Sequence, residues 1–291
     1  MTNTSVFNLA NFAPLIIKIK KMVKTVLVTG ASAGIGKATA IYLAQNGYNV
    51  YGAARRIEKM QDLKRHGIKP ISLDVSNEES LVACVDQIIK DSGSIDILIN
   101  SAGSGCYGAL EDMPISDAKY QLEVNVFAVA HLIQLVLPTM RKNNYGKIVN
   151  ISSVGGKVTL PMGVWYHASK FAIEGLSDAL RKEVKSFGID VIVIEPGGTK
   201  SEMTGLGTEY LNRVSGNTAY SHLAKGVSKM YAETEKNASD PIVIAKLIKK
   251  GIEANNPKTR YVAASGAKLL LFLRRLLSDK LFDKLVMSQM K

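Results

Sequence analysis

Apolar and polar residues alternate in blocks from Lys24 to about Ala264, and these blocks predict alternating strands and helices. Helical apolar spacing predicts helices at 35–46, 57–65, 116–142, 164–187 and 241–254, and one that begins near 77 with a capping box at Ser76–Glu79. Short, nearly continuous apolar runs predict strands at 24–30, 49–55, 69–75, 95–100, 146–153, 189–198 and 260–264. Such strands, each followed by a helix, are typical of a parallel sheet covered on both faces. We therefore expect a Rossmann-type, doubly wound α/β fold with about seven strands.

Three segments depart from this alternation of strands and helices. Residues 1–21 precede a second methionine, Met22, and we expect them to be a mis-assigned start or a disordered tail. Residues 200–238 mix small, polar and charged residues and predict a mobile flap within a single catalytic domain, 22–264. Residues 265–291 predict an amphipathic helix or helix pair. The alternatives for this tail are that it covers the protein's own core, caps the cleft, binds a partner, or makes peripheral contact with an anionic membrane.

Composition narrows the classes of function. The chain of 291 residues is 46% hydrophobic and 21% charged, as in ordinary globular proteins. Cys84 and Cys106 lie outside any CxxC pair and the four histidines are scattered, so we expect no metal site and a reducing, cytoplasmic location. The net charge is +12, but the basic residues are spread along the chain without a nucleic-acid-binding motif, so we expect no nucleic-acid partner.

A glycine-rich stretch follows the first predicted strand directly. In TGASAGIG (29–36), the glycines at 30, 34 and 36 allow a tight turn and close approach of a ligand. The free N–H groups at the start of the next helix then point at an anion. Together they predict a pyrophosphate site at the first βα turn. The alternative is a glycine-rich turn without a ligand.

Two arginines follow the second predicted strand. NAD enzymes usually place an acidic residue here, for the ribose 2′-hydroxyl, whereas this chain has Arg55 and Arg56. Guanidinium groups suit a 2′-phosphate, so we expect NADP(H) in preference to NAD(H). The alternative is that both are exposed loop charges. Asp74, which ends the third predicted strand, is expected to accept from an adenine amino group or to be a surface-turn aspartate.

A phenol and an ammonium group stand four residues apart on a mostly apolar predicted helix. Tyr166 and Lys170 in YHASK lie one turn apart on the same face. A nearby ammonium lowers the pKa of a phenol from about 10 toward the range useful for proton transfer. The alternative is that both side chains snorkel at a surface.

These motifs, in this order, resemble the short-chain dehydrogenase/reductase family from about Lys24 to Met203. NSAG (100–103) is similar to the family's NNAG motif, with Ser101 replacing the second asparagine, and PGGTKS (196–201) resembles the loop after the sixth strand. Asn125 lies in EVNVFA, and Ser153 lies at the family's usual distance before Tyr166. GAARR, SVGG, YHASKFAIEG and the leucine-rich tail look most like the 17β-hydroxysteroid-dehydrogenase-like branch. Ala33 stands where many NADP-preferring members carry a basic residue.

The resemblance implies an NADP(H)-dependent enzyme that interconverts a carbonyl and an alcohol, with Tyr166 as general acid/base. Lys170 would tune Tyr166 and bind ribose, and Ser153 would hold the substrate carbonyl beside Tyr166. Asn125, the fourth catalytic residue, would connect Lys170 through a water to solvent. The expected cofactor-binding residues are Gly30, Ser32, Gly34, Ile35, Gly36, Arg55, Arg56, Asp74, Val75, Asn100, Ala102, Gly103, Tyr166, Lys170, Pro196, Gly197 and Thr199.

The substrate class rests on apolar residues expected near the site. Tyr107, Met162, Trp165 and Met203 favour a small hydrophobic carbonyl or alcohol substrate, although such residues are more often ordinary core. We also expect a homodimer or homotetramer. The alternative function is a non-catalytic NADP(H)-binding redox sensor or regulatory protein. Retention of all four catalytic residues favours the enzyme.

Overall fold

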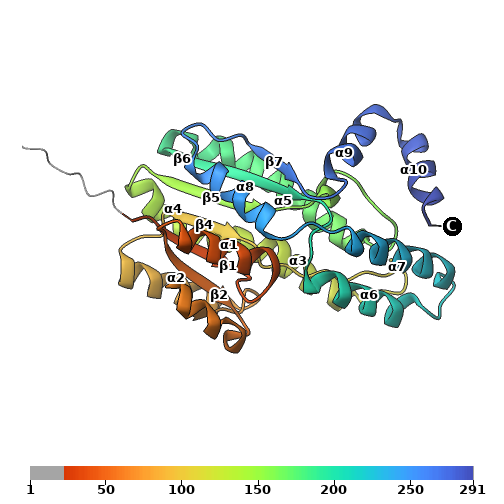
Figure 1. Ribbon diagram of the computed structural model, residues 1–291, viewed down its shortest axis with the longest axis horizontal. Helices are drawn as coiled ribbons and strands as arrows, with labels where there is room; N and C mark the ends of the chain where they lie inside the picture. The colour runs from red at the N-terminus through yellow and green to blue at the C-terminus, as the bar shows by residue number, and fades with distance from the viewer. Residues whose placement is uncertain (1–22, 291) are drawn as a thin grey trace, which may run out of the picture.

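A seven-stranded parallel sheet lies at the centre of the protein, between layers of helices (Figure 1). The computed structural model describes residues 23–290, so the expectation for residues 1–21 lies outside the described part. The strands run in the order β3-β2-β1-β4-β5-β6-β7. Their bounds are β1 Thr25–Thr29, β2 Asn49–Ala54, β3 Lys69–Ser72, β4 Ile97–Asn100, β5 Gly146–Ile151, β6 Ile189–Pro196 and β7 Arg260–Ala263. The predicted doubly wound α/β fold is confirmed.

Each face of the sheet has its own apolar core. Alternate residues of a strand point to opposite faces, so Leu27 of β1 belongs to one core while Val26 and Val28 belong to the other. Helices α2 (Glu78–Ser92), α4 (Ala128–Lys142) and α5 (Val164–Val184) pack on the Leu27 face. Helices α1 (Gly34–Gln45) and α8 (Ile242–Glu253) cover the other face. Strands buried on both faces explain the continuous apolar runs in the sequence.

The predicted helix 116–142 forms as three joined pieces. Helix α3 (Ile115–Leu122) continues through a π-helical turn, η3 (Glu123–Phe127), into α4. By length and composition alone this helical stretch would be able to cross a membrane. Its apolar residues, including Leu132, Ile133 and Val136, instead pack in the core on the Leu27 face. It therefore acts as a core helix of the sheet.

Two local details differ from the sequence interpretation. The predicted helix 57–65 is a 3₁₀ helix, η2 (Ile57–His66). Helix α2 is capped by Asn77, whose side chain accepts a hydrogen bond from the Ser80 amide at 2.7 Å, and not by Ser76. The Ser76 hydroxyl donates to Asp74 at 2.7 Å, so the start of the helix moves one residue along the chain.

Residues 200–238 form two helices outside the sheet. These helices, α6 (Glu202–Ser215) and α7 (Ser221–Lys236), lie at one end of the molecule with α9 (Ala267–Leu276) and α10 (Asp279–Ser288) (Figure 1). A third apolar cluster joins them, to which Leu211, Val227, Phe282 and Val286 contribute. The tail therefore packs on the segment that was expected to be a mobile flap.

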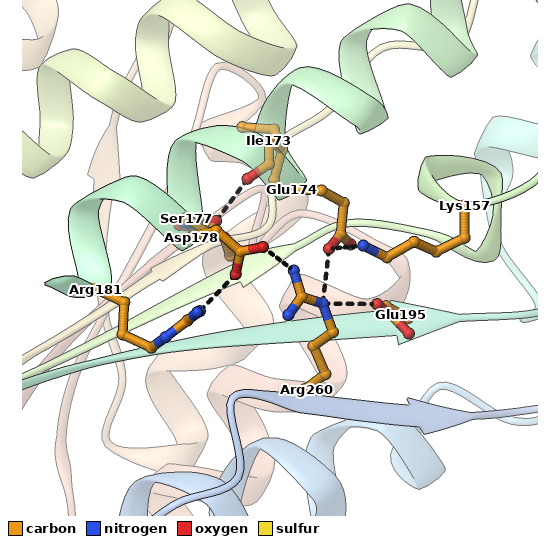
Figure 2. A network of polar contacts seen from close by, with 9 residues as sticks. Lys157, Ile173, Glu174, Ser177, Asp178, Arg181, Glu195 and Arg260 are labelled. Atoms are coloured by element: carbon orange, nitrogen blue, oxygen red, sulfur yellow. Dashed lines mark hydrogen bonds and ion pairs between the residues drawn. The ribbon is translucent and has the colours of Figure 1, made fainter.

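A buried network of ion pairs fastens α5 to β6 and β7 (Figure 2). Glu174 of α5 accepts from Arg260 Nε at 3.0 Å, and Lys157 Nζ lies 2.8 Å from the same carboxylate oxygen. Arg260 also donates to Asp178 at 2.7 Å and lies 3.3 Å from Glu195. Burial, reinforced by the adjacent carboxyl of Glu174, raises the pKa of Glu195 to about 7. Glu195 is therefore largely protonated below neutral pH, while the Glu174 carboxyl is paired with Lys157 and Arg260.

The protonated state of Glu195 makes stability depend on pH. A carboxyl whose pKa is higher in the folded than in the unfolded chain stabilises the fold at low pH, and this contribution is lost as pH rises through the folded pKa. Glu195→Gln replaces the acid with a neutral side chain. Between about pH 5 and pH 8, its free energy of unfolding relative to wild type should therefore increase by on the order of 1–3 kcal/mol.

Urea unfolding at both pH values measures this difference. Glu183→Gln, an exposed carboxyl on α5, is the matched control and should keep the wild-type pH dependence. The same pH dependence in Glu195→Gln and wild type would show that Glu195 is ionised throughout.

Candidate active site

A cleft of about 1440 Å³ opens at the carboxyl ends of the strands, with α6, α9 and α10 on its far side. It spans the point where β1 and β4, neighbours in the sheet, lead to helices on opposite faces, the usual ligand position in doubly wound sheets. Asp74, Asn100 and Asn125 of the predicted site residues do not line it. The other predicted residues do: Gly30, Ser32, Gly34, Ile35, Gly36, Arg55, Arg56, Val75, Ala102, Gly103, Ser153, Tyr166, Lys170, Pro196, Gly197 and Thr199.

The glycine loop is shaped for an anion. Gly30 has φ +69°, and a Cβ there would lie 2.9 Å from the backbone of Ala102. A Cβ on Gly36 would overlap the Gly30 carbonyl. Among the residues described, α1 begins at Gly34 with neither a side-chain cap nor an acidic residue in its first turn. Its first N–H groups are thus free to bind the pyrophosphate of a dinucleotide.

Thr29 ties the glycine loop to the NSAG loop. Its hydroxyl oxygen accepts hydrogen bonds from the amides of Ser101 and Ala102, both at 3.0 Å. Asn100 points away from the cleft, because its amide donates to Asn150 in the next strand at 2.9 Å. The sequence interpretation assigned no role to Thr29, although it is the first residue of the glycine motif.

The two arginines lie where a 2′-phosphate is expected. Arg55 donates to the Tyr120 hydroxyl at 2.8 Å. Arg56 donates to Ser32 at 3.2 Å and forms an ion pair with Glu202 at 2.8 Å, which joins the end of β2 to the start of α6. Two guanidinium groups therefore flank the cleft beside the glycine loop.

Asp74 closes a turn outside the cleft. It accepts hydrogen bonds from the Ser76 amide at 3.0 Å and the Ser76 hydroxyl at 2.7 Å. Burial acts to raise the pKa of Asp74, but the bonds from Ser76 and the charge of Arg55 outweigh it, and the pKa is lowered. This turn places Val75 on the cleft wall.

Ser153, Tyr166 and Lys170 converge on one part of the cleft. Ser153 and Tyr166 both line this part of the cleft, and Ser153 acts to lower the pKa of the Tyr166 phenol. The ammonium of Lys170 donates to the Ile151 carbonyl at 3.0 Å and lies 5.8 Å from the centre of the Tyr166 ring. Helical spacing places Tyr166 and Lys170 on one face of α5, and β5 ends beside that face. The structure thus brings a phenol, a serine hydroxyl and an ammonium group together.

The pKa of the Tyr166 phenol shifts opposite to the sequence expectation. We expected Lys170 to lower it, but burial raises it above its ordinary value, and only the hydrogen bond with Ser153 opposes burial. Burial also lowers the pKa of Lys170 to about 8, against the charge of Glu174. At neutral pH the Tyr166 phenol is therefore protonated, and Lys170 is charged in most molecules. A phenol that donates a proton beside a cation requires these two protonation states.

Asn125 supports the site from behind the cleft wall. It lies in the π-helical turn η3, a kind of irregularity frequent at functional sites. Its side chain accepts from the Ser104 amide at 2.8 Å and donates to the Ser104 carbonyl at 2.9 Å. It also donates to Ser169 of α5 at 3.0 Å. In this structure, Asn125 joins the NSAG loop to the helix that carries Tyr166 and Lys170.

His167 is a structural residue that the sequence interpretation missed. Its Nε2 accepts a hydrogen bond from the Leu160 amide at 2.9 Å, so Nδ1 carries the proton and donates to the Gly155 carbonyl at 2.9 Å. Burial lowers its pKa, which keeps the ring neutral. His167 thereby holds both ends of the loop that follows Ser153. Its position within YHASK is the only sequence signal.

Tyrosines and apolar side chains line the part of the cleft around Tyr166. The Tyr107 ring lies 5.3 Å from the rings of both Tyr166 and Tyr231. Leu160, Met203, Leu206, Leu270, Leu273 and Met290 also line the cleft. Of the residues expected to line a substrate pocket, Tyr107 and Met203 line the cleft, whereas Met162 and Trp165 do not.

Known proteins share this fold and sequence. A family model for short chain dehydrogenases matches residues 24–210. A 3-ketodihydrosphingosine reductase from Bacteroides thetaiotaomicron is 37% identical over 236 residues, covering 81% of this chain and 86% of that protein. An NADPH-dependent 3-dehydrocapnine reductase from Ornithobacterium rhinotracheale is 31% identical, covering 91% of this chain and 96% of that protein.

Among solved structures, a short-chain dehydrogenase from Streptomyces avermitilis superposes with a TM-score of 0.77 at 29% identity, covering 90% of this chain and 94% of that one. These relatives do not single out the 17β-hydroxysteroid-dehydrogenase-like branch, which stays a prediction. The chain belongs to the short-chain dehydrogenase/reductase family and is an oxidoreductase acting on CH–OH or C=O groups.

Proposed function

We propose that the protein reduces the ketone of a long-chain hydrophobic substrate with NADPH, and that Tyr166 donates the proton. The observation that carries this proposal is the meeting of Ser153, Tyr166 and Lys170 between an anion-binding glycine loop and an apolar part of the same cleft. A buried phenol with a raised pKa is protonated at neutral pH, which suits reduction better than oxidation.

The residues divide the reaction between them. When bound, the cofactor supplies the hydride that adds to the carbonyl carbon. The Ser153 hydroxyl donates a hydrogen bond to the carbonyl oxygen and orients it. Tyr166 transfers its phenolic proton to that oxygen, which becomes the alcohol oxygen. The Lys170 ammonium stabilises the phenolate that remains until a solvent proton replaces the one transferred.

The cofactor preference rests on the end of β2. Arg55 and Arg56 flank the cleft there, and Ala54 stands where an NAD enzyme usually has an acid. One relative is named as NADPH-dependent, which also supports NADP(H).

The substrate class rests on the cleft wall and on the relatives' names. Leu206, Leu270, Leu273 and other apolar side chains line the part of the cleft away from the glycine loop, which suits an alkyl chain. Both related reductases are named for ketones at carbon 3, and dihydrosphingosine is a long-chain amino alcohol. The Tyr107 ring lies 5.3 Å from the Tyr166 ring and 5.3 Å from the Tyr231 ring, so tyrosines stand beside the position proposed for the ketone.

Removing the Tyr166 hydroxyl should separate binding from turnover. Tyr166→Phe lacks the proton donor but keeps the ring, so kcat for reduction of 3-ketodihydrosphingosine should fall about 10²- to 10⁴-fold. The Kd for NADPH, from a fluorescence titration, should stay within about 2-fold because the glycine loop is intact. Tyr145→Phe, outside the cleft, is the control and should behave as wild type. Substantial turnover by Tyr166→Phe would exclude the phenol as the proton donor.

Reversing the charge of Arg55 should change the cofactor preference. Hydrogen bonds between charged groups contribute about 1.5–3 kcal/mol, so Arg55→Asp should weaken NADPH binding at least about 10-fold. NADH binding should change little, because NADH has no 2′-phosphate. Arg65→Asp, an exposed charge reversal on η2, controls for the general loss of positive charge. An unchanged NADPH-to-NADH ratio in Arg55→Asp would return Arg55 to the role of an exposed loop charge.

A further inference from the structure

Helices α9 and α10 carry a second apolar face that points outward. They stand at the end of the molecule where the cleft opens, away from the sheet (Figure 1). On α9, Leu269, Phe272 and Leu276 are 63%, 61% and 67% exposed, and their spacing places them on one side of the helix. The outward surface of α9 therefore carries an apolar stripe, where a solvated helix would be polar.

Helix α10 continues this exposed surface. Leu281 and Leu285, four residues apart, are both exposed. The neighbouring Phe282 and Val286 are buried in the cluster shared with α6 and α7. The helix is thus held to the protein by one apolar stripe and presents another to the outside. We call the exposed residues Leu269, Phe272, Leu276, Leu281 and Leu285 the tail face.

Positive charge accompanies the tail face. Residues 265–290 contain five basic residues, Lys268, Arg274, Arg275, Lys280 and Lys284, against two acidic ones, Asp279 and Asp283. Arg274 is paired with Asp279 at 2.7 Å. Lys268, Arg275, Lys280 and Lys284 are exposed, and the ion pairs found within residues 23–290 include none of them. An apolar stripe flanked by such residues is typical of helices that lie in the plane of a membrane surface.

The tail face is continuous with the mouth of the cleft. Leu269 of α9 and Leu285 of α10 are exposed, and both also line the cleft. Leu206 of α6, 61% exposed, lines it from another side. An alkyl chain leaving the cleft would therefore meet apolar side chains from the interior to the outer surface.

We propose that α9 and α10 rest on an anionic lipid bilayer and hold the mouth of the cleft against it. The apolar stripe would enter the boundary between headgroups and acyl chains, and the four free cations would contact anionic headgroups. Entry of a long-chain ketone directly from the bilayer follows if the proposed function is right, but the membrane contact itself does not depend on it. A second copy fits less well, because a two-fold contact would bring the same positive charges face to face.

Sedimentation of the full-length protein with vesicles tests this proposal. Wild type should sediment with vesicles of phosphatidylcholine containing about a quarter phosphatidylglycerol, and much less with phosphatidylcholine alone or at high salt. Phe272→Ser/Leu276→Ser should lose most binding to both, since these side chains lie on the tail face outside the cleft. Arg275→Glu/Lys280→Glu should lose the preference for anionic vesicles. Ile115→Ser, equally exposed on α3, is the control and should bind as wild type.

Several outcomes would overturn the proposal. One is wild type in the supernatant with every kind of vesicle, and another is sedimentation of the tail-face variants to the same extent as wild type. A dimer in solution that dissociates in Phe272→Ser/Leu276→Ser, without vesicle binding, would assign the tail face to a second copy instead. Reduction of 3-ketodihydrosphingosine dispersed in detergent, in the absence of vesicles, is assayed in parallel. Failure of that assay in wild type would count against the proposed function, whereas the sedimentation result would stand on its own.

Discussion

The position of α5 against the sheet is the constraint on which the site depends, because this one helix carries Tyr166 and Lys170. Buried charges are costly unless they are paired, and Glu174 of α5 is buried between Lys157 and Arg260 (Figure 2). A shift of α5 by one turn would separate these charges and leave the Glu174 carboxylate buried without a partner. The network therefore fixes the position of α5 along its axis and its rotation about that axis. These two together set the distance from Tyr166 to the loop that begins at Ser153.

The same arrangement joins parts of the chain that are far apart in sequence. Lys157 follows the Ser153 loop, and Glu195 directly precedes Pro196, which lines the cleft at the end of β6. At the carboxyl end of β1, Thr29 holds the NSAG loop against the glycine loop. The glycine loop, the Ser153 loop and the end of β6 thus follow different strands and are aligned by a few polar contacts. This alignment brings Ser153, Tyr166 and Lys170 to one part of the cleft.

Local patterns in the sequence predicted the strands, the glycine loop and the pairing of Tyr166 with Lys170, because each depends on neighbours within one or two turns. Contacts between distant segments were not predictable in this way. Asn100 was expected to bind the cofactor, yet it donates to Asn150 across the sheet. The direction of the Tyr166 pKa shift follows from burial by segments far along the chain. Helices α6 and α7 escaped prediction because their inward-facing residues are few and lie among polar ones.

The central claim, that this cleft transfers hydride to a ketone, is tested most directly by isotope transfer. NADPH carrying deuterium at carbon 4 of the nicotinamide would be incubated with the protein and 3-ketodihydrosphingosine, and the alcohol product analysed by mass spectrometry. The account predicts one deuterium on the carbinol carbon of the product, from one of the two C4-labelled epimers only. Saturable binding of NADPH without label in any alcohol would contradict it and would favour a protein that senses the cofactor.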